Sequence, residues 1–217
     1  MGVGTAIHHV GTVLLLAATA LLIVVSITSP VVNNLSLMKV DLNGQNTIGD
    51  RVTFGTFGYC ILGVNGRDAC TGSHIGYEPT NVISQIDNVS FSNADHDSTK
   101  ILTKVFVLHP VAAGLSFLAF LLCLGTSIIG SFIASVFSLL AFVATIIALA
   151  CDFATFAIIK HAVNTRSSTA SEASWGTGVW CVVAAAACTL VASLLVFVTC
   201  CAGRRKSSRR NKDAAGY

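Results

Sequence analysis

Four long apolar runs constrain this 217-residue chain more than any other feature. They cover about Val10–Thr28, Val105–Leu124, Phe132–Ile159 and Thr177–Cys201. Each is close to or longer than the ~20 residues that a helix needs to cross about 30 Å of hydrocarbon. Lipid offers no hydrogen-bond partner, so the backbone of such a run must bond internally, as a helix does. Charged residues make up only 11% of the chain, against about 25% in soluble proteins. The sequence therefore predicts four transmembrane helices.

The basic residues predict how these helices are oriented. Six of the chain's 13 Lys and Arg lie within residues 203–212, and positive segments stay on the cytosolic side. We therefore expect both termini in the cytosol. The expected order is a cytosolic N-terminus (1–9), a first transmembrane helix (10–28), a first extracellular loop (29–104), a second helix (105–124), a cytosolic turn (125–131), a third helix (132–159), a second extracellular loop (160–176), a fourth helix (177–201) and a basic cytosolic tail (202–217).

The first extracellular loop contains Cys60 and Cys70, the only cysteines away from the apolar runs and their edges. Between them, Asn65-Gly66 is typical of a two-residue hairpin turn, because both residues tolerate a positive φ. Residues with high β-propensity flank the turn, which predicts a hairpin joined by a disulfide in an oxidising compartment. Closing an 11-residue loop stabilises by about 2.5–3 kcal/mol in the chain-entropy model.

Further strands are expected at Leu35–Leu42 and Asn81–Phe91, and the polar segment Ser92–Thr99 is expected to lead back to the membrane. The predicted fold is a membrane all-α four-helix bundle with a small extracellular antiparallel sheet of four or five strands.

Several residues in or near the spans are candidates for a role. Asp152 is an acidic residue inside an apolar run, where a charge costs ~2.5–3.5 kcal/mol on insertion scales. A proton or ion relay and an interhelical hydrogen bond are both open, and the second is favoured because the other spans carry only scattered Ser and Thr. His109, before Pro110 in a first helical turn, is expected at the outer interface as a cap, with pH sensing as the alternative. Small residues for helix packing recur at Ala184, Cys188 and Ala192.

Other candidate sites concern modification and lipid. Asn34 and Asn88 begin N-x-Ser sequons, and Cys200 and Cys201 are candidate palmitoylation sites. The tail suits anionic inner-leaflet lipids at ~1 kcal/mol per basic residue, or it serves only as a topology signal. Its basic residues include Arg204, Arg205, Lys206, Arg209 and Arg210.

No catalytic grouping, phosphate-binding glycine loop or metal-ligand spacing is found in the sequence. We therefore predict no enzyme activity, cofactor or metal. We predict no nucleic-acid partner, because the basic stretch is a short tail next to the membrane.

The first loop also carries a pattern made by Gly55, Phe57, Tyr59, Cys60 and Cys70. In a four-span chain this pattern resembles the claudin-like tetraspan proteins. Further blocks are similar to the fungal PalI family of ambient-pH response proteins, whose relatives include the eisosome tetraspanners. These blocks are Ser29–Val32, Val52–Cys60, Ile75–Tyr77, His109–Ala113, Asp152-Phe153, Trp180 and the exit Cys201–Arg205. PalI proteins often have a long cytosolic C-terminus, whereas this sequence ends at Tyr217, so we carry over no function of such a tail.

The resemblance implies a plasma-membrane accessory protein that helps to place or stabilise a seven-helix PalH-type pH sensor. Alternatives are a scaffold of a plasma-membrane domain of the eisosome type, an auxiliary subunit of a membrane enzyme such as a cell-wall synthase, and a small transporter or proton channel that uses Asp152. Expected partners are other integral membrane proteins, anionic lipids and further copies of the chain.

Overall fold

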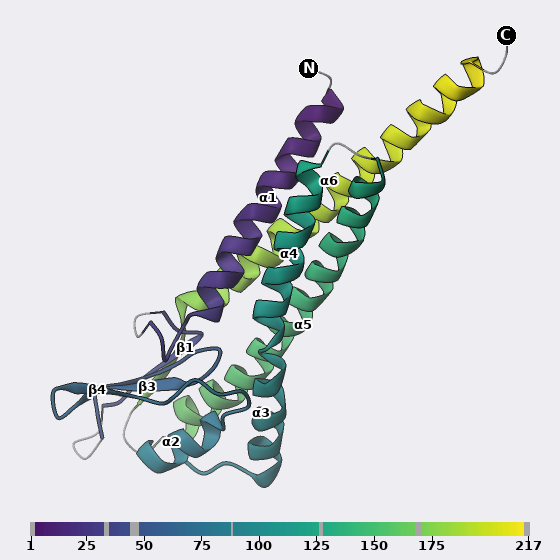
Figure 1. Ribbon diagram of the computed structural model, residues 1–217. Helices are drawn as coiled ribbons and strands as arrows, with labels where there is room; N and C mark the ends of the chain where they lie inside the picture. The colour runs from purple at the N-terminus through teal and green to yellow at the C-terminus, as the bar shows by residue number, and fades with distance from the viewer. Residues whose placement is uncertain are drawn as a thin grey trace. The chain divides into compact units, whose positions relative to one another are not determined.

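The computed structural model describes residues 3–32, 35–43, 48–87, 89–125, 128–167 and 171–214, with side chains outside 3–6, 128–129 and 200–214. Its helices are α1 (Val3–Ser26), α2 (Pro79–Asp87), α3 (Asn93–Val105), α4 (Leu108–Leu124), α5 (Ile128–Arg166) and α6 (Thr177–Ala214) (Figure 1). Its strands are β1 (Met38–Asp41), β2 (Arg51–Phe54), β3 (Tyr59–Val64), β4 (Arg67–Cys70) and β5 (Glu172–Trp175).

Four stretches of the described chain are helical, long and apolar enough to cross a membrane. They are Ile7–Ser26, Asn93–Leu124, Gly130–Arg166 and Thr177–Thr199. Their exposed faces carry large apolar side chains, including Leu139, Leu194 and Phe197, each more than half exposed. Lipid is the solvent that such faces require. The prediction of a multi-pass membrane protein with four spans is confirmed.

The chain divides into two compact units, which we describe separately. The bundle unit comprises Met1–Leu21, Val111–Thr145 and Ala184–Tyr217. The sheet unit comprises Leu22–Pro110 and Ile146–Val183.

The bundle unit is a packing of four helix segments. Its buried core consists of Leu15, Ala119, Cys123, Ala134, Ala192 and Val196. Small side chains predominate in this core, and they allow helix backbones to approach closely in the absence of a hydrophobic driving force. Several buried hydroxyl groups in the unit donate to the backbone of their own helix, as Thr145 does to the Ala141 carbonyl (2.7 Å).

The sheet unit contains one five-stranded antiparallel sheet in the order β4-β3-β2-β1-β5. Four strands come from the first predicted loop, which confirms the expected small antiparallel sheet. The fifth strand, β5, comes from the second loop and was not predicted. It pairs with β1 so that Met38 lies opposite Trp175. The sheet is therefore completed by a segment more than a hundred residues further along the chain.

One prediction for the first loop is wrong. Residues 81–87 of the expected Asn81–Phe91 strand belong to the helix α2, in which Val82, Ile83 and Ile86 are buried at helical spacing. Pro79 suits this assignment because a proline in a first helical turn loses no hydrogen bond. The polar segment Ser92–Thr99 belongs largely to α3, whose first turn has a capping box between Ser92 and Asp95. Local β-propensity was misleading because the apolar residues recur every three or four positions.

Candidate functional site: the sheet and its helix contacts

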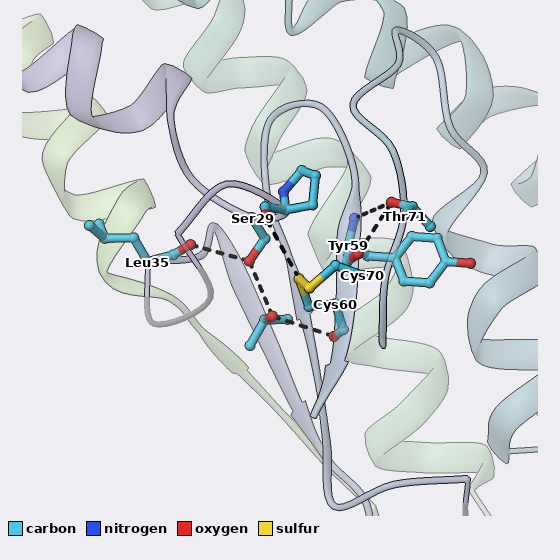
Figure 2. Close-up of a disulfide and its surroundings, with 8 residues drawn as sticks. Ser29, Leu35, Tyr59, Cys60, Cys70 and Thr71 are labelled. Atoms are coloured by element: carbon cyan, nitrogen blue, oxygen red, sulfur yellow. Dashed lines mark hydrogen bonds between the residues drawn. A yellow bond between two sulfur atoms is a disulfide. The ribbon is translucent and has the colours of Figure 1, made fainter. Parts of the chain in front are cut away.

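The predicted hairpin is formed by β3 and β4. Asn65 (φ 50°) and Gly66 (φ 76°) make its turn, and a positive φ at both positions is what a type I′ hairpin turn requires. Cys60 and Cys70 lie directly opposite each other on the two strands and form a disulfide, which confirms the predicted pairing (Figure 2). The covalent bond therefore fixes the edge strand β4 to β3.

The glycines of the loop motif are explained by close backbone contacts. A Cβ at Gly55 would lie 2.6 Å from the backbone nitrogen of Ser29, and closer still to its carbonyl oxygen. At Gly58 a Cβ would meet the Thr71 hydroxyl oxygen at 2.7 Å. The Gly55 amide donates to the Gly58 carbonyl (2.9 Å) and closes the turn between β2 and β3. This turn can lie against the chain that follows α1 only because it has no side chain at these positions.

Hydroxyl groups connect the same turn to α1. The Thr56 hydroxyl donates to the carbonyl of Val25 (2.7 Å), and its amide donates to the Thr28 hydroxyl (3.0 Å). Ser29 donates to the Thr53 hydroxyl on β2 (3.1 Å). Figure 2 shows the contacts of Ser29 beside the disulfide, including its bond toward Leu35. It also shows the bonds between Tyr59 and Thr71. The bonds of Thr56 to Val25 and of Ser29 to Thr53 join different elements, so the end of α1 and the chain after it are fixed to the sheet.

Tyr77 secures the other side of the turn. Its buried hydroxyl donates to the Gly55 carbonyl (2.7 Å), while its own carbonyl accepts from Thr103 of α3 (2.8 Å). Burial and, secondarily, the nearby Asp152 carboxyl raise the pKa of the Tyr77 hydroxyl well above its usual value. The hydroxyl therefore keeps its proton and remains a donor. Nothing in the sequence pointed to Tyr77 beyond its place in a family block.

The structure brings together two residues that the sequence analysis treated separately, His109 of α4 and Asp152 of α5. The distance from His109 Nε2 to Asp152 Oδ1 is 3.3 Å, and both side chains are fully buried. Phe106 lies against the imidazole, with ring centroids 6.0 Å apart. His109 is thus an interior residue and not a cap at an interface. A separation of 43 residues hid the pairing from the sequence.

The second predicted loop is fixed to the sheet unit by polar contacts. Asn164 at the end of α5 accepts from the Ala173 amide (2.8 Å), and Ser171 donates to the buried Asp87 carboxyl (2.9 Å). The Gly176 amide donates to the Leu37 carbonyl (2.8 Å). A Cβ at Gly176 would lie 2.6 Å from the carbonyl carbon of Ser36. These contacts hold β5 beside β1.

The remaining candidate residues are dispersed. Along α6, Ala184 is exposed, Cys188 is half-buried and Ala192 is buried, so they do not share one packed face within the chain. Asn34 and Asn88 lie outside the described residues. The residues Cys200, Cys201, Arg204, Arg205, Lys206, Arg209 and Arg210 lie in the part of α6 whose side chains are not described.

The described contacts of this site connect separate elements of the sheet unit. Among the described residues, no cluster of three or more His, Cys, Asp or Glu is placed to hold a metal ion. What the site does offer is a sheet that joins both predicted outer loops to the ends of the membrane helices.

Comparison with known proteins agrees with this architecture. The SUR7/PalI family model matches residues 7–209. The chain is 32% identical over 116 residues to the pH-response regulator protein palI/RIM9 of Emericella nidulans, covering 54% of this chain and 18% of that protein. It is 30% identical over 112 residues to palI/prr-5 of Neurospora crassa (52% and 14%), and 32% identical over 102 residues to the uncharacterized membrane protein TOS7 of Saccharomyces cerevisiae (47% and 15%). The chain thus spans less than a fifth of the length of these relatives.

Four spans and an antiparallel sheet between the first two of them define a claudin-like four-span membrane protein. The family match covers nearly the whole sequence, and the chain belongs to the SUR7/PalI family.

Proposed function

We propose that this chain is a non-enzymatic accessory protein of the ambient-pH response that helps a seven-helix PalH-type sensor to reach, or remain stable in, the plasma membrane. The proposal is supported by family membership, by relatives named as pH-response regulators, and above all by the sheet that joins both predicted outer loops. A fixed sheet presents the same surface at all times, so little ordering entropy is lost when a partner binds.

The proposal includes a topology. The disulfide needs an oxidising compartment, which supports a sheet unit on the extracellular side. The basic segment that follows Cys201 suits the cytosolic side. In this arrangement the tail contacts anionic lipids of the inner leaflet, and Cys200 and Cys201 are sites for palmitoylation beside it.

Chemical crosslinking in native membranes, followed by mass spectrometry, tests the partner. We expect crosslinks from lysines of the sheet unit, such as Lys39 and Lys104, to a seven-helix membrane protein. Surface biotinylation should show a lower surface level of that protein when this chain is deleted and recovery when it is restored. A sensor that reaches the surface normally without this chain would contradict the proposal.

A scaffold of a plasma-membrane domain, or an auxiliary subunit of a membrane enzyme such as a cell-wall synthase, is the second candidate. The family model also covers SUR7 proteins, and TOS7 is named only as a membrane protein. Crosslinks mainly to further copies of this chain, or to a synthase, would favour this candidate over the first.

A transporter or channel based on Asp152 has less support. In the bundle unit, the buried hydroxyls of Thr19, Thr145 and Thr189 are each bonded to their own helix. Such hydroxyls do not form a relay between helices. A flux in liposomes that is lost in Asp152→Asn would nevertheless restore this candidate.

A further inference from the structure

One loop of the sheet unit runs along the side of α3. The loop joins β4 to α2, and three contacts in succession connect it to the helix. They are Glu78 with Lys100, the Tyr77 carbonyl with the Thr103 hydroxyl (2.8 Å), and Gly76 with the side chain of Lys104. The residue number falls along the loop as it rises along α3, so the loop runs toward the end of α3 that leads into α4.

The charges of α3 show where the apolar part of this candidate span begins. Asp95, Asp97, Lys100 and Lys104 are distributed along the helix, whereas residues 105–124 contain no Asp, Glu, Lys or Arg. Lys104 is therefore the last of these charged residues before the apolar part of the span. Such a position lies where the lipid headgroups meet the hydrocarbon, and basic side chains often mark this depth.

Ile75 is the next residue of the loop in the direction of the apolar span. Its side chain is 57% exposed. The backbone is held on both sides of it, because the His74 amide donates to the Phe57 carbonyl (2.9 Å) and Gly76 packs against Lys104. A Cβ at Gly76 would lie only 2.7 Å from Cγ of Lys104, so this approach needs a glycine. The loop thus presents a large apolar side chain at a fixed place.

Exposed apolar side chains also flank Lys104. Ile101 and Val107 lie three residues before and after it and are 61% and 37% exposed. Residues three apart are neighbours on a helix surface. Lys104 forms no ion pair among the described residues, since Glu78 pairs with Lys100. A free lysine among apolar side chains suits a lipid interface, where its stem lies on hydrocarbon and its ammonium reaches the headgroups.

We propose that Ile75, Ile101, Lys104 and Val107 form a lipid-contact site through which the sheet unit rests on the membrane. Ile75 enters the boundary between headgroups and acyl chains, and the Lys104 ammonium binds headgroup phosphates of the same leaflet. The site continues the lipid-facing surface of the span Asn93–Leu124. It goes beyond the accessory role and needs no partner protein, so the two proposals fail in different experiments.

Hydroxyl-radical footprinting of the unaltered full chain in phospholipid nanodiscs tests the site. Ile48, in the loop between β1 and β2 of the same unit, is the matched control because it is 55% exposed, against 57% for Ile75. We expect Ile75 to be oxidised at least about threefold more slowly than Ile48, because lipid at this depth excludes water from its side chain. Equal oxidation rates of the two side chains would overturn the lipid-contact site.

Photocrosslinking identifies what covers Ile75. Benzoylphenylalanine is introduced at position 75 or at position 48 of the full chain, and the protein is reconstituted in nanodiscs that hold two copies. Mass spectrometry should find mainly lipid adducts at position 75 and few at position 48. Crosslinks from position 75 mainly to the second copy would overturn the proposal and assign this surface to self-association.

Lys104→Gln tests the phosphate contact separately from the apolar one. In nanodiscs of phosphatidylcholine and phosphatidylglycerol, lipid adducts at position 75 should be enriched in the anionic lipid by up to about fivefold over its bulk share, the effect of one basic residue. The enrichment should disappear in Lys104→Gln and remain in Lys39→Gln, which alters a half-buried lysine of β1. Enrichment that persists in Lys104→Gln would overturn the role of Lys104.

Discussion

The bundle unit and the sheet unit both bury threonine hydroxyl groups, but these hydroxyls bond to different partners. In the bundle unit, the Thr189 hydroxyl donates to Ala185 in its own helix (2.9 Å). In the sheet unit, the Thr56 hydroxyl donates across a turn to Val25 at the end of α1 (2.7 Å). A hydroxyl that donates within its own helix keeps its hydrogen bond wherever the helix lies. The hydrogen bond from Thr56 to Val25 forms only when the unit is assembled.

This difference has an energetic consequence. Small residues pack the bundle core, and many similar contacts share the work of holding it together. The sheet unit has a larger apolar core, in which Phe54, Phe106 and Phe156 are fully buried. It also contains individual contacts that no neighbour can replace, including the glycine approach at Ser29, the disulfide and the Tyr77 hydroxyl. We therefore expect single substitutions to unfold the sheet unit locally while the bundle unit stays intact.

The largest effect is expected for Gly55→Ala. The added methyl group would overlap the backbone of Ser29, and backbone atoms cannot rotate away as a side chain would. We expect the free energy of unfolding of the sheet unit to fall by about 3 kcal/mol or more. Gly72→Ala is the matched control, because a Cβ there has no atom within 4 Å. Limited proteolysis with and without denaturant measures both variants, and equal stabilities would refute the close-approach account.

A somewhat smaller loss is expected for Cys70→Ser. Closing the loop between Cys60 and Cys70 stabilises by about 2.5–3 kcal/mol in the chain-entropy model, and the loss should fall on β3 and β4. Surface delivery, measured by biotinylation, should decline. Cys188→Ser, which alters a half-buried free thiol of the bundle unit, should have little effect. Normal delivery and protease resistance in Cys70→Ser would show that the hairpin does not need its covalent bond.

Tyr77→Phe should cost about 1–3 kcal/mol, because it leaves the buried Gly55 carbonyl without its donor. Tyr59→Phe is the control from the same aromatic cluster. The ring of Tyr59 packs 6.3 Å from that of Tyr77, but its hydroxyl has no hydrogen bond among the described contacts. Chemical denaturation monitored by tyrosine fluorescence and proteolysis should separate the two. Equal losses would mean that the rings matter and the hydroxyl does not.

The smallest effects test the comparison most directly. Thr56→Val and Thr189→Val remove a hydroxyl and keep the shape of the side chain. We expect about 1–2 kcal/mol for Thr56, because loss of its hydroxyl leaves the Thr28 hydroxyl (3.2 Å away) and the Val25 carbonyl each with one partner fewer. For Thr189 we expect about 0.6 kcal/mol or less, as measured for hydrogen bonds within membranes. A larger loss at Thr189, determined by unfolding in detergent, would break the distinction between the two units.

Much of the fold was predictable because its signals are local. The four spans follow from the length and apolarity of each run, and the β3–β4 hairpin follows from Asn65-Gly66 between its two cysteines. The helix α2 was missed because β-branched residues such as Val82 and Ile83 favour strands in isolation. Their burial on one face of a helix outweighed that preference.

The candidate site was predictable only in part. Gly55 and Cys60 were selected from the pattern of the loop, but the physical reason for Gly55 is the Ser29 backbone, which no local pattern specifies. Asp152 was selected because a carboxyl in an apolar run is unusual. His109 was selected separately, for its place before Pro110, but its pairing with Asp152 was not predicted, since nothing in either sequence neighbourhood points to the other.

The sequence by itself determined that this chain has four membrane helices, a hairpin joined by a disulfide, and an acidic residue, Asp152, inside an apolar run. These follow from hydrophobicity, turn chemistry and charge, which act over a few residues. Only the tertiary structure decided that the second loop supplies β5, that a glycine must face Ser29, and that Asp152 meets a histidine. Such contacts join residues far apart in the chain, and they depend on packing in three dimensions that residue order alone does not specify.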